Sequence, residues 1–145
     1  MINKLLTAAA LVALSGTYAM AESHSAEGGD SEAMEFEITG DAEAGEKVFR
    51  KCMACHAVGE GAQNKVGPVL NGVVGRDVAS HEGFSYSDAL MEKSDMQWTP
   101  ENLAAFLENP RDWAPGTKMS FAGLRKEEDR NDVIAYLATF KDESM

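Results

Sequence analysis

Apolar residues recur at the three- and four-residue spacing of an amphipathic α-helix in three separate segments of the chain. In the first segment, Asp41 is suited to cap a helix N-terminus, and Val48, Phe49 and Cys52 follow at helical spacing. An aspartate at this position can accept hydrogen bonds from the first backbone N–H groups, which have no partner inside the helix. We therefore predict a helix that begins near residue 41.

The second segment has clear signals at both ends. Thr99 is suited as the N-cap, and Pro100 occupies the first helical position, where a missing N–H costs nothing. The apolar positions of residues 103–107 fit one helix face. Pro110 disfavours helical backbone in the residue before it, so we predict that this helix ends at Asn109.

The third segment runs from about Glu127 to Phe140 and has an apolar face that includes Val133, Ile134 and Leu137. A short helix is also predicted near residues 87–92, and loops rich in glycine and proline separate the helices. No stretch alternates convincingly between apolar and polar residues as a β-strand would. The predicted fold class is all-α, with about three to five short helices and long loops.

The N-terminal residues predict export from the cytoplasm. Lys4 precedes an apolar run from Leu5 to Leu14, and the small-residue pattern Ala19-Met20-Ala21 follows it. This layout is typical of a secretory signal peptide, here residues 1–21 with cleavage after Ala21. The apolar run is shorter than the roughly 20 residues that span a bilayer. We therefore expect the mature protein in the periplasm.

The rest of the chain divides by composition. Residues 22–39 are rich in acidic residues, serine and glycine, and we predict an acidic disordered leader there. One ordered domain is expected over residues 40–141, followed by a flexible tail at 142–145. The whole chain has 24 acidic and 13 basic residues, a formal net charge of −11 at pH 7. This charge disfavours nucleic acid or an anionic membrane surface as a partner.

The only two cysteines of the chain lie in the sequence Cys52-Met53-Ala54-Cys55-His56. At this spacing each thiol can bond to one vinyl group of a porphyrin while the adjacent imidazole reaches the iron. A disulfide is the simplest alternative in an exported protein, whereas a zinc site would lack ligands and a thioredoxin-like pair would follow a strand. We predict one covalently attached haem c, bound by Cys52 and Cys55 with His56 as an axial ligand.

Haem iron bound by one histidine still lacks its sixth ligand, and a methionine there is typical of an electron carrier. Met119 is the favoured candidate, because the turn-forming pair Pro115-Gly116 precedes it and can direct its side chain inward. On chemistry alone, His81 or an open site remains an alternative.

A longer series of residues supports this interpretation: Gly45, Phe49, Cys52 to His56, Gly67-Pro68, Leu70, Gly72, Gly75-Arg76, Gly83-Phe84, Tyr86, Trp98, Leu107, Asn109-Pro110, Pro115 to Met119, Phe121 to Gly123, Arg130 and Ile134 to Leu137. With this series the chain resembles class I cytochrome c, in the group of mitochondrial cytochrome c and bacterial cytochrome c2, from Gly40 to Leu137. The resemblance implies the cytochrome c fold, wrapped around one haem, with Met119 as the sixth ligand.

The resemblance also implies residues that surround the haem. Pro68 is expected to accept a hydrogen bond from the second nitrogen of the His56 ring, and Arg76, Tyr86 and Trp98 are expected to hold the haem propionates.

Leu90, Phe106 and Phe121 are expected in the distal pocket. The family often has asparagine in place of Leu90 and usually tyrosine in place of Phe106, so this pocket should contain fewer hydrogen bonds beside the iron.

Several basic residues are expected, by the same resemblance, around the exposed haem edge: Lys47, Lys51, Lys65, Arg111, Lys118, Arg125 and Lys126. They predict transient electrostatic docking to acidic sites on membrane redox complexes. The expected function is that of a soluble, monomeric electron carrier without enzymatic activity or a small-molecule substrate. It would shuttle single electrons from a bc1-type donor to an oxidase, a photosynthetic reaction centre or a reductase. The alternative is a haem enzyme or gas-binding haem protein with a labile sixth ligand.

Overall fold

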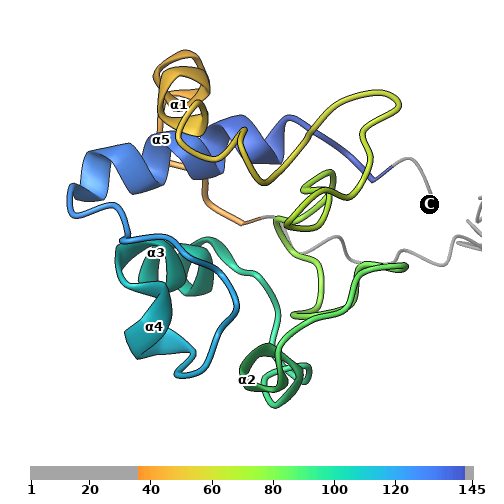
Figure 1. The fold of residues 1–145 in the computed structure, drawn as a ribbon. Coiled ribbons are helices and arrows are strands. Elements are labelled where there is room, and N and C mark those ends of the chain that lie inside the picture. The colour runs from red at the N-terminus through yellow and green to blue at the C-terminus, as the bar shows by residue number, and fades with distance from the viewer. Residues whose placement is uncertain (1–35, 143–145) are drawn as a thin grey trace, which may run out of the picture. The chain divides into compact units, whose positions relative to one another are not determined.

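The computed structural model describes residues 36–142, which belong to one unit of the chain. Its helices are α1 (Ala42–Phe49), α2 (Asp88–Met91), α3 (Pro100–Glu108), α4 (Pro110–Trp113) and α5 (Glu127–Ala138) (Figure 1). Within residues 36–142 the extended pairing is limited to an isolated bridge between Asp77 and Gln97. The all-α fold class predicted from the sequence is therefore confirmed. The predicted signal peptide, leader residues 22–35 and tail residues 143–145 lie outside the described residues.

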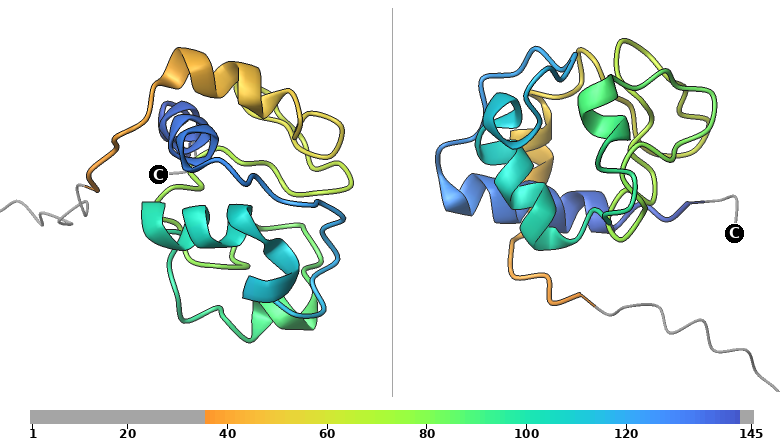
Figure 2. Two further views of the ribbon diagram at one scale, coloured as in Figure 1. Left: turned by 90° about the vertical axis from the view of Figure 1, so that its left-hand side faces the viewer. Right: turned by 90° about the horizontal axis from the view of Figure 1, so that it is seen from below.

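Helix α1 crosses α5 at close range, as both views of Figure 2 show. The crossing depends on Gly45, because a Cβ there would collide with the Asp132 carbonyl group and lie 2.8 Å from the Cβ of Tyr136. Beside this contact the rings of Phe49 and Tyr136 pack with their centroids 5.3 Å apart. A glycine that would weaken an isolated helix thus allows two helices to bury their faces against each other.

The start of α1 is fixed by two aspartates. The Asp41 carboxylate accepts hydrogen bonds from the N–H groups of Glu43 at 2.8 Å and Ala44 at 3.0 Å, which confirms the predicted N-cap. The backbone N–H of Asp41 in turn donates to Asp132 Oδ1 at 2.8 Å. The cap of α1 is therefore attached to α5. The helix ends at Phe49, so Cys52 lies in the turn that follows and not in the helix itself.

The signals at residues 99–110 produce two helices. Thr99 Oγ1 accepts from the N–H of Asn102 at 3.1 Å, and Pro100 begins α3 as predicted. Asn109 has extended backbone, and Pro110 then begins the short helix α4. A proline suits the first position of a helix. Pro110, which follows the end of α3 at Asn109, therefore begins a new helix. The sequence interpretation recognised the end at Asn109 and missed this second helix.

The buried core is formed by α1, α3, α5 and several of the loops between them. It includes Phe49 of α1, Leu103 and Phe106 of α3, and Val133 and Ile134 of α5. Seen from below, α3 and α4 lie on one side, and α2 with the preceding loops lies on the other (Figure 2, right). None of the helices in residues 36–142 is long and apolar enough to cross a membrane.

Residues 36–39, assigned from composition to the leader, are among the described residues. The ring of Phe36 comes within 3.0 Å of the position that a Cβ would occupy on Gly75. Among the described residues, contact of the chain with the domain thus extends back to Phe36.

We predict that Gly45→Ala destabilises the protein by about 2–3 kcal/mol, because the added methyl group forces α1 away from α5. At an exposed interior helix position the same change would stabilise the protein by up to about 1 kcal/mol, so the sign is diagnostic. Denaturant titration of the haem-loaded protein measures the difference. The matched control is Glu46→Ala, an exposed neighbour in α1, for which we expect a change within about 0.5 kcal/mol.

Candidate haem-binding site

A largely apolar cavity of about 240 Å³ lies among α3, α5 and the loops. Ten side chains predicted from the sequence line it together: Cys52, Cys55, His56, Pro68, Tyr86, Leu90, Trp98, Phe106, Met119 and Phe121. These residues span almost 70 positions of the sequence, so the fold brings together groups that no local motif connects. Arg76 was predicted with them and does not line the cavity.

The segment after α1 places the attachment motif on the cavity wall through successive turns. The N–H of Cys52 donates to Phe49 O at 2.7 Å, and the N–H groups of Cys55 and His56 both donate to Cys52 O, at 3.0 and 2.9 Å. Both cysteines are half-buried, and they form no disulfide with each other. Burial raises the pKa of the Cys52 thiol, an effect that Lys51 partly opposes and Cys55 reinforces. The neutral thiol is thus favoured over a metal-binding thiolate.

The imidazole of His56 is held in one tautomer. Its Nδ1 lies 2.8 Å from Pro68 O, and because a carbonyl can only accept, Nδ1 must carry the hydrogen. Nε2 then has a lone pair free for a metal. Burial lowers the pKa of His56, the hydrogen bond to Pro68 opposes this, and Lys65 lowers it further. The ring is therefore kept neutral, as an iron ligand requires.

Gly67 allows the backbone to pass directly over this ring. A Cβ at position 67 would lie 2.8 Å from both ring nitrogens of His56. The Gly67 N–H also donates to Cys55 O at 2.9 Å, which fixes the loop against the attachment turn. Gly67 thus packs on the face of the His56 ring, and Pro68 accepts a hydrogen bond at its edge. Contacts of this kind fix the orientation of a metal-binding histidine and raise its basicity as a ligand.

Met119 reaches the same cavity from the segment after α4. The N–H of Thr117 donates to Ala114 O at 2.9 Å, and the N–H of Met119 lies 3.3 Å from Thr117 Oγ1. Gly116 between them has φ +94°, a left-handed conformation that the Pro-Gly sequence supplies. The predicted turn thus exists, and Met119 and His56 line one cavity from different segments of the chain.

A short antiparallel pairing positions the predicted propionate residues. Trp98 N donates to Arg76 O at 2.8 Å, and Gly75 N donates to Trp98 O at 2.9 Å. The Arg76 guanidinium donates to Asn71 O at 2.9 Å, and its Nε is buried without a partner among the described residues. Burial raises the pKa of Tyr86, so its hydroxyl stays protonated and can donate. Trp98 and Tyr86 line the cavity, and Arg76 does not.

Ser87 was missed by the sequence interpretation. Its hydroxyl is buried, lines the cavity and has no hydrogen-bond partner within the described chain. It precedes α2 without capping it through its side chain. Such a hydroxyl is costly unless a ligand satisfies it, and the carboxylate of a haem would do so. Ser87 looks in the sequence like an ordinary helix cap, so only its burial distinguishes it.

The remaining features of the cavity also fit a haem. Two thiols suit vinyl groups, and an imidazole with a free Nε2 and a thioether are a common ligand pair for haem iron. Apolar side chains, among them Leu70, Val73 and Phe106, suit the face of a porphyrin. Groups of three or more His, Cys, Asp or Glu residues that could hold a bare metal ion are absent from residues 36–142. The donor set is therefore that of a haem.

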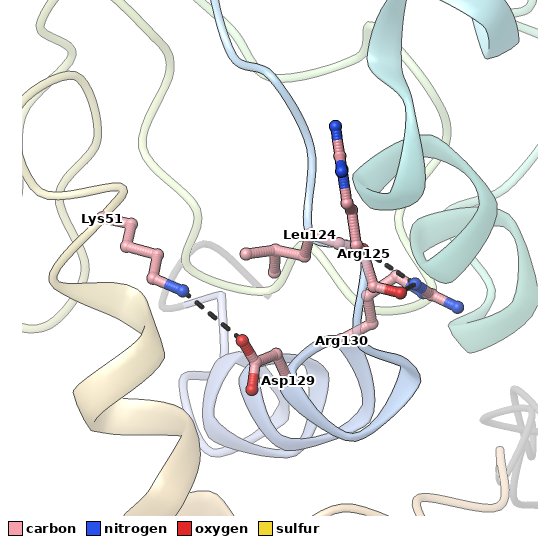
Figure 3. A network of polar contacts seen from close by, with 5 residues as sticks. All are labelled: Lys51, Leu124, Arg125, Asp129 and Arg130. Carbon is pink, nitrogen blue, oxygen red and sulfur yellow. Dashed lines mark hydrogen bonds and ion pairs between the residues drawn. The ribbon is translucent and has the colours of Figure 1, made fainter.

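Helix α5 connects the two segments that bear the predicted iron ligands (Figure 3). Lys51, next to Cys52, pairs with Asp129 at 3.4 Å. Arg130 Nη1 donates to the carbonyl oxygens of Leu124 at 2.7 Å and Arg125 at 3.1 Å, in the segment that follows Met119. Neighbouring residues at the start of α5 thus hold both walls of the cavity.

The predicted docking residues are all exposed: Lys47, Lys51, Lys65, Arg111, Lys118, Arg125 and Lys126. Lys51 and Lys118 line the cavity, and no described carboxylate does. Lys65 Nζ donates to Met53 O at 3.0 Å, and the Arg125 side chain extends away from α5 (Figure 3). Within the described chain the cavity lining therefore contains two lysines and no carboxylate, and one of these lysines, Lys51, pairs with Asp129 outside the lining.

An all-α fold with a Cys-X-X-Cys-His turn and a methionine in one apolar cavity defines a c-type cytochrome. The family model described as Cytochrome c matches residues 42–141. Cytochrome c-550 of Ancylobacter novellus is 60% identical over 99 residues, which cover 66% of this chain and 92% of that protein. Cytochrome c2 of Blastochloris viridis is 49% identical over 100 residues, covering 69% and 78%.

Solved structures agree with these relatives. The structure of cytochrome c2 from Rhodospirillum centenum has a TM-score of 0.67 at 40% identity and covers 71% of this chain and 100% of that one. Cytochrome cH from Methylobacterium extorquens has a TM-score of 0.64 at 42% identity, covering 69% and 99%. The chain belongs to the cytochrome c family, as a class I c-type cytochrome with one covalently attached haem c. It is an electron carrier.

We predict that Ser87→Ala lowers the free energy of unfolding of the haem-loaded protein by about 1.5–3 kcal/mol, the usual loss of a hydrogen bond to a charged group. If the hydroxyl had no partner in the loaded protein, its removal would be neutral or stabilising. Denaturant titration measures the change, and Ser85→Ala, two residues away and exposed, is the control expected within about 0.5 kcal/mol.

Proposed function

We propose that the protein is a periplasmic carrier that shuttles single electrons between membrane redox complexes. The observation that carries the proposal is the presence of His56 and Met119 in one apolar cavity. When bound, the haem supplies a reversible one-electron couple at its iron. The chain's own part is to provide a ligand for each side of the iron, so that neither is left for a substrate. No enzymatic step is then needed.

Cys52 and Cys55 are proposed to form the two thioether bonds. This attachment holds the haem in the protein in both oxidation states, which suits a carrier that moves between partners. Pro68 fixes the orientation of His56 through the bond at Nδ1. Tyr86, Trp98 and Ser87 are proposed to face the propionates, with Arg76 supporting them from behind.

The distal side is proposed to be unusually apolar. Leu90, Phe106 and Phe121 line the cavity, and a leucine and two phenylalanines offer no polar side-chain atom to the methionine sulfur or to a bound oxygen species. A gas-binding site or a peroxide-activating enzyme uses distal hydrogen-bond donors to favour its ligand. These residues therefore support the carrier over the alternative of a reactive haem protein.

The basic residues at the cavity mouth are proposed to dock on acidic sites of the partners. Lys51 and Lys118 line the cavity, and Lys47, Lys65, Arg111, Arg125 and Lys126 complete the proposed surface. Exposed charges steer association and add little to the lifetime of the complex, so encounters are fast and brief. We propose a bc1-type complex as the donor and an oxidase, a photosynthetic reaction centre or a reductase as the acceptor. The signal peptide predicted at residues 1–21 supports the periplasm as the location.

We predict that Met119→Ala abolishes the methionine-sulfur-to-iron charge-transfer band of the ferric protein and lowers its reduction potential, because a thioether ligand favours the ferrous state. Visible absorption and potentiometry measure the two effects. Met91→Ala, a half-exposed methionine outside the cavity, is the matched control and should change neither. A wild-type ferric protein that is high-spin and lacks the band would instead support a labile sixth site.

We predict that electron transfer to a membrane oxidase slows steeply as the ionic strength rises from about 0.01 to about 0.15 M, where the Debye length falls from about 30 to about 8 Å. Stopped-flow oxidation of the ferrous protein measures the rate. Arg125→Gln should reduce the rate and flatten its salt dependence, whereas Lys141→Gln, which removes an exposed charge outside the proposed surface, should not. A rate that is independent of salt would contradict the basic docking surface.

A further inference from the structure

The segment that bears Met119 is anchored at its start by Trp113, the last residue of α4. The Trp113 ring stacks on Trp98 with centroids 5.2 Å apart and meets Phe106 edge-on at 5.5 Å. Trp98 and Phe106 line the haem cavity, and Trp113 does not. Trp113 therefore packs behind the cavity wall, six residues before the proposed iron ligand.

The Trp113 ring also makes a cation–π contact with a lysine. Lys93 Nζ lies 4.7 Å from the centroid of the Trp113 ring, well within the range of a cation–π contact. Lys93 follows α2, and its own N–H donates to Leu90 O at 3.1 Å, so its backbone belongs to the wall that contains Leu90. The contact thus joins the α2 segment to the Met119 segment across the outside of the cavity.

Two further contacts connect the same segments. A Cβ on Gly116 would lie 3.7 Å from the Cβ of Ala89, and Lys118 Nζ lies 3.4 Å from Tyr86 O. The Met119 segment is held at its far end by the bond from Leu124 N to Leu107 O, at 2.7 Å. Between these two ends, the polar and aromatic contacts that join it to the α2 segment within the described chain are those of Lys93 with Trp113 and of Lys118 with Tyr86.

We propose that Lys93 is a positioning residue, which keeps Met119 on the iron by fixing Trp113 through a cation–π contact. The proposal rests on Met119 being the sixth ligand. A partly exposed cation–π contact is worth about 0.5–1 kcal/mol, or about 2- to 5-fold in an equilibrium. Loss of the contact therefore raises the population in which the Met119 segment has moved away by that factor.

Other charged residues in or beside α2 and α4 could also affect the Met119 segment, so pH and ionic strength must be held constant in a test. They are Asp88, Glu92 and Asp95 in or beside α2, and Arg111 and Asp112 in α4. Because their charges respond to pH, Met119 release is measured at one neutral pH and one ionic strength. Imidazole is the probe, since it occupies the iron only after the methionine has left and its apparent affinity rises with the released population.

The experiment titrates imidazole into the ferric haem-loaded protein and follows the loss of the methionine–iron charge-transfer band. Lys93→Met keeps an apolar side chain of similar length and removes the cation, and we expect imidazole to bind about 2- to 5-fold more tightly. Lys93→Arg should restore the wild-type affinity. Lys141→Met is the control for loss of a surface charge and should leave the affinity unchanged.

A double-mutant cycle with Trp113→Leu separates the contact from other effects of Lys93. In that background Lys93→Met should have no further effect on imidazole affinity, because the partner ring is gone. Equal affinities of wild type and Lys93→Met would overturn the proposal, as would an undiminished effect in the Trp113→Leu background. A wild-type protein without the charge-transfer band would refute Met119 ligation itself, which is a different and separately visible result.

Discussion

The structure depends on a volume in its centre that its own side chains do not fill. The cavity measures about 240 Å³. At about 24 cal/mol for each Å³, a protein of this kind would lose about 6 kcal/mol by leaving such a volume open. That is comparable to the entire stability of a small domain, about 5–15 kcal/mol. The haem is therefore as much a part of the core as Phe106 or Val133, and this explains how helices of four to twelve residues suffice.

A core of this kind must still be closed by protein contacts, and α5 provides most of them. Helix α5 packs against α1 at Gly45, and its Asp132 accepts a hydrogen bond from the backbone N–H of Asp41, the N-cap of α1. Its first turns hold Lys51 through Asp129 and the carbonyl oxygens after Met119 through Arg130. The attachment turn and the methionine segment are far apart in sequence, and both contact α5. Because both segments contact the same helix, a displacement of one segment relative to the other is resisted through α5.

The local signals of the sequence were sufficient for α1, α2, α3 and α5 and for the Cys52–His56 attachment motif, whereas the other residues around the cavity were predicted mainly from the resemblance to cytochrome c. Asp41 and Thr99 cap helices as predicted, because capping depends only on neighbours in sequence. The second helix at Pro110 was missed, since one proline both ends and begins a helix there. Ser87 was missed because its importance comes from burial, and Arg76 does not line the cavity, since its guanidinium donates to Asn71 O instead. Burial and long-range pairing are not visible in a local pattern.

The distribution of polar atoms around the cavity bears on the energy of the electron itself. Oxidation adds a positive charge to the iron, and an apolar surrounding disfavours the more charged state. The wall formed by Leu90, Phe106 and Phe121 therefore favours the reduced form. The exposed lysines Lys51 and Lys118 act in the same direction, although solvent screens them. Tyr86 and Ser87 also line the cavity and could donate hydrogen bonds to a haem propionate. Such bonds would reduce the effective negative charge of the propionate. The propionate would then stabilise the oxidised iron less. Each of these three features would favour the reduced form of a haem held in this cavity.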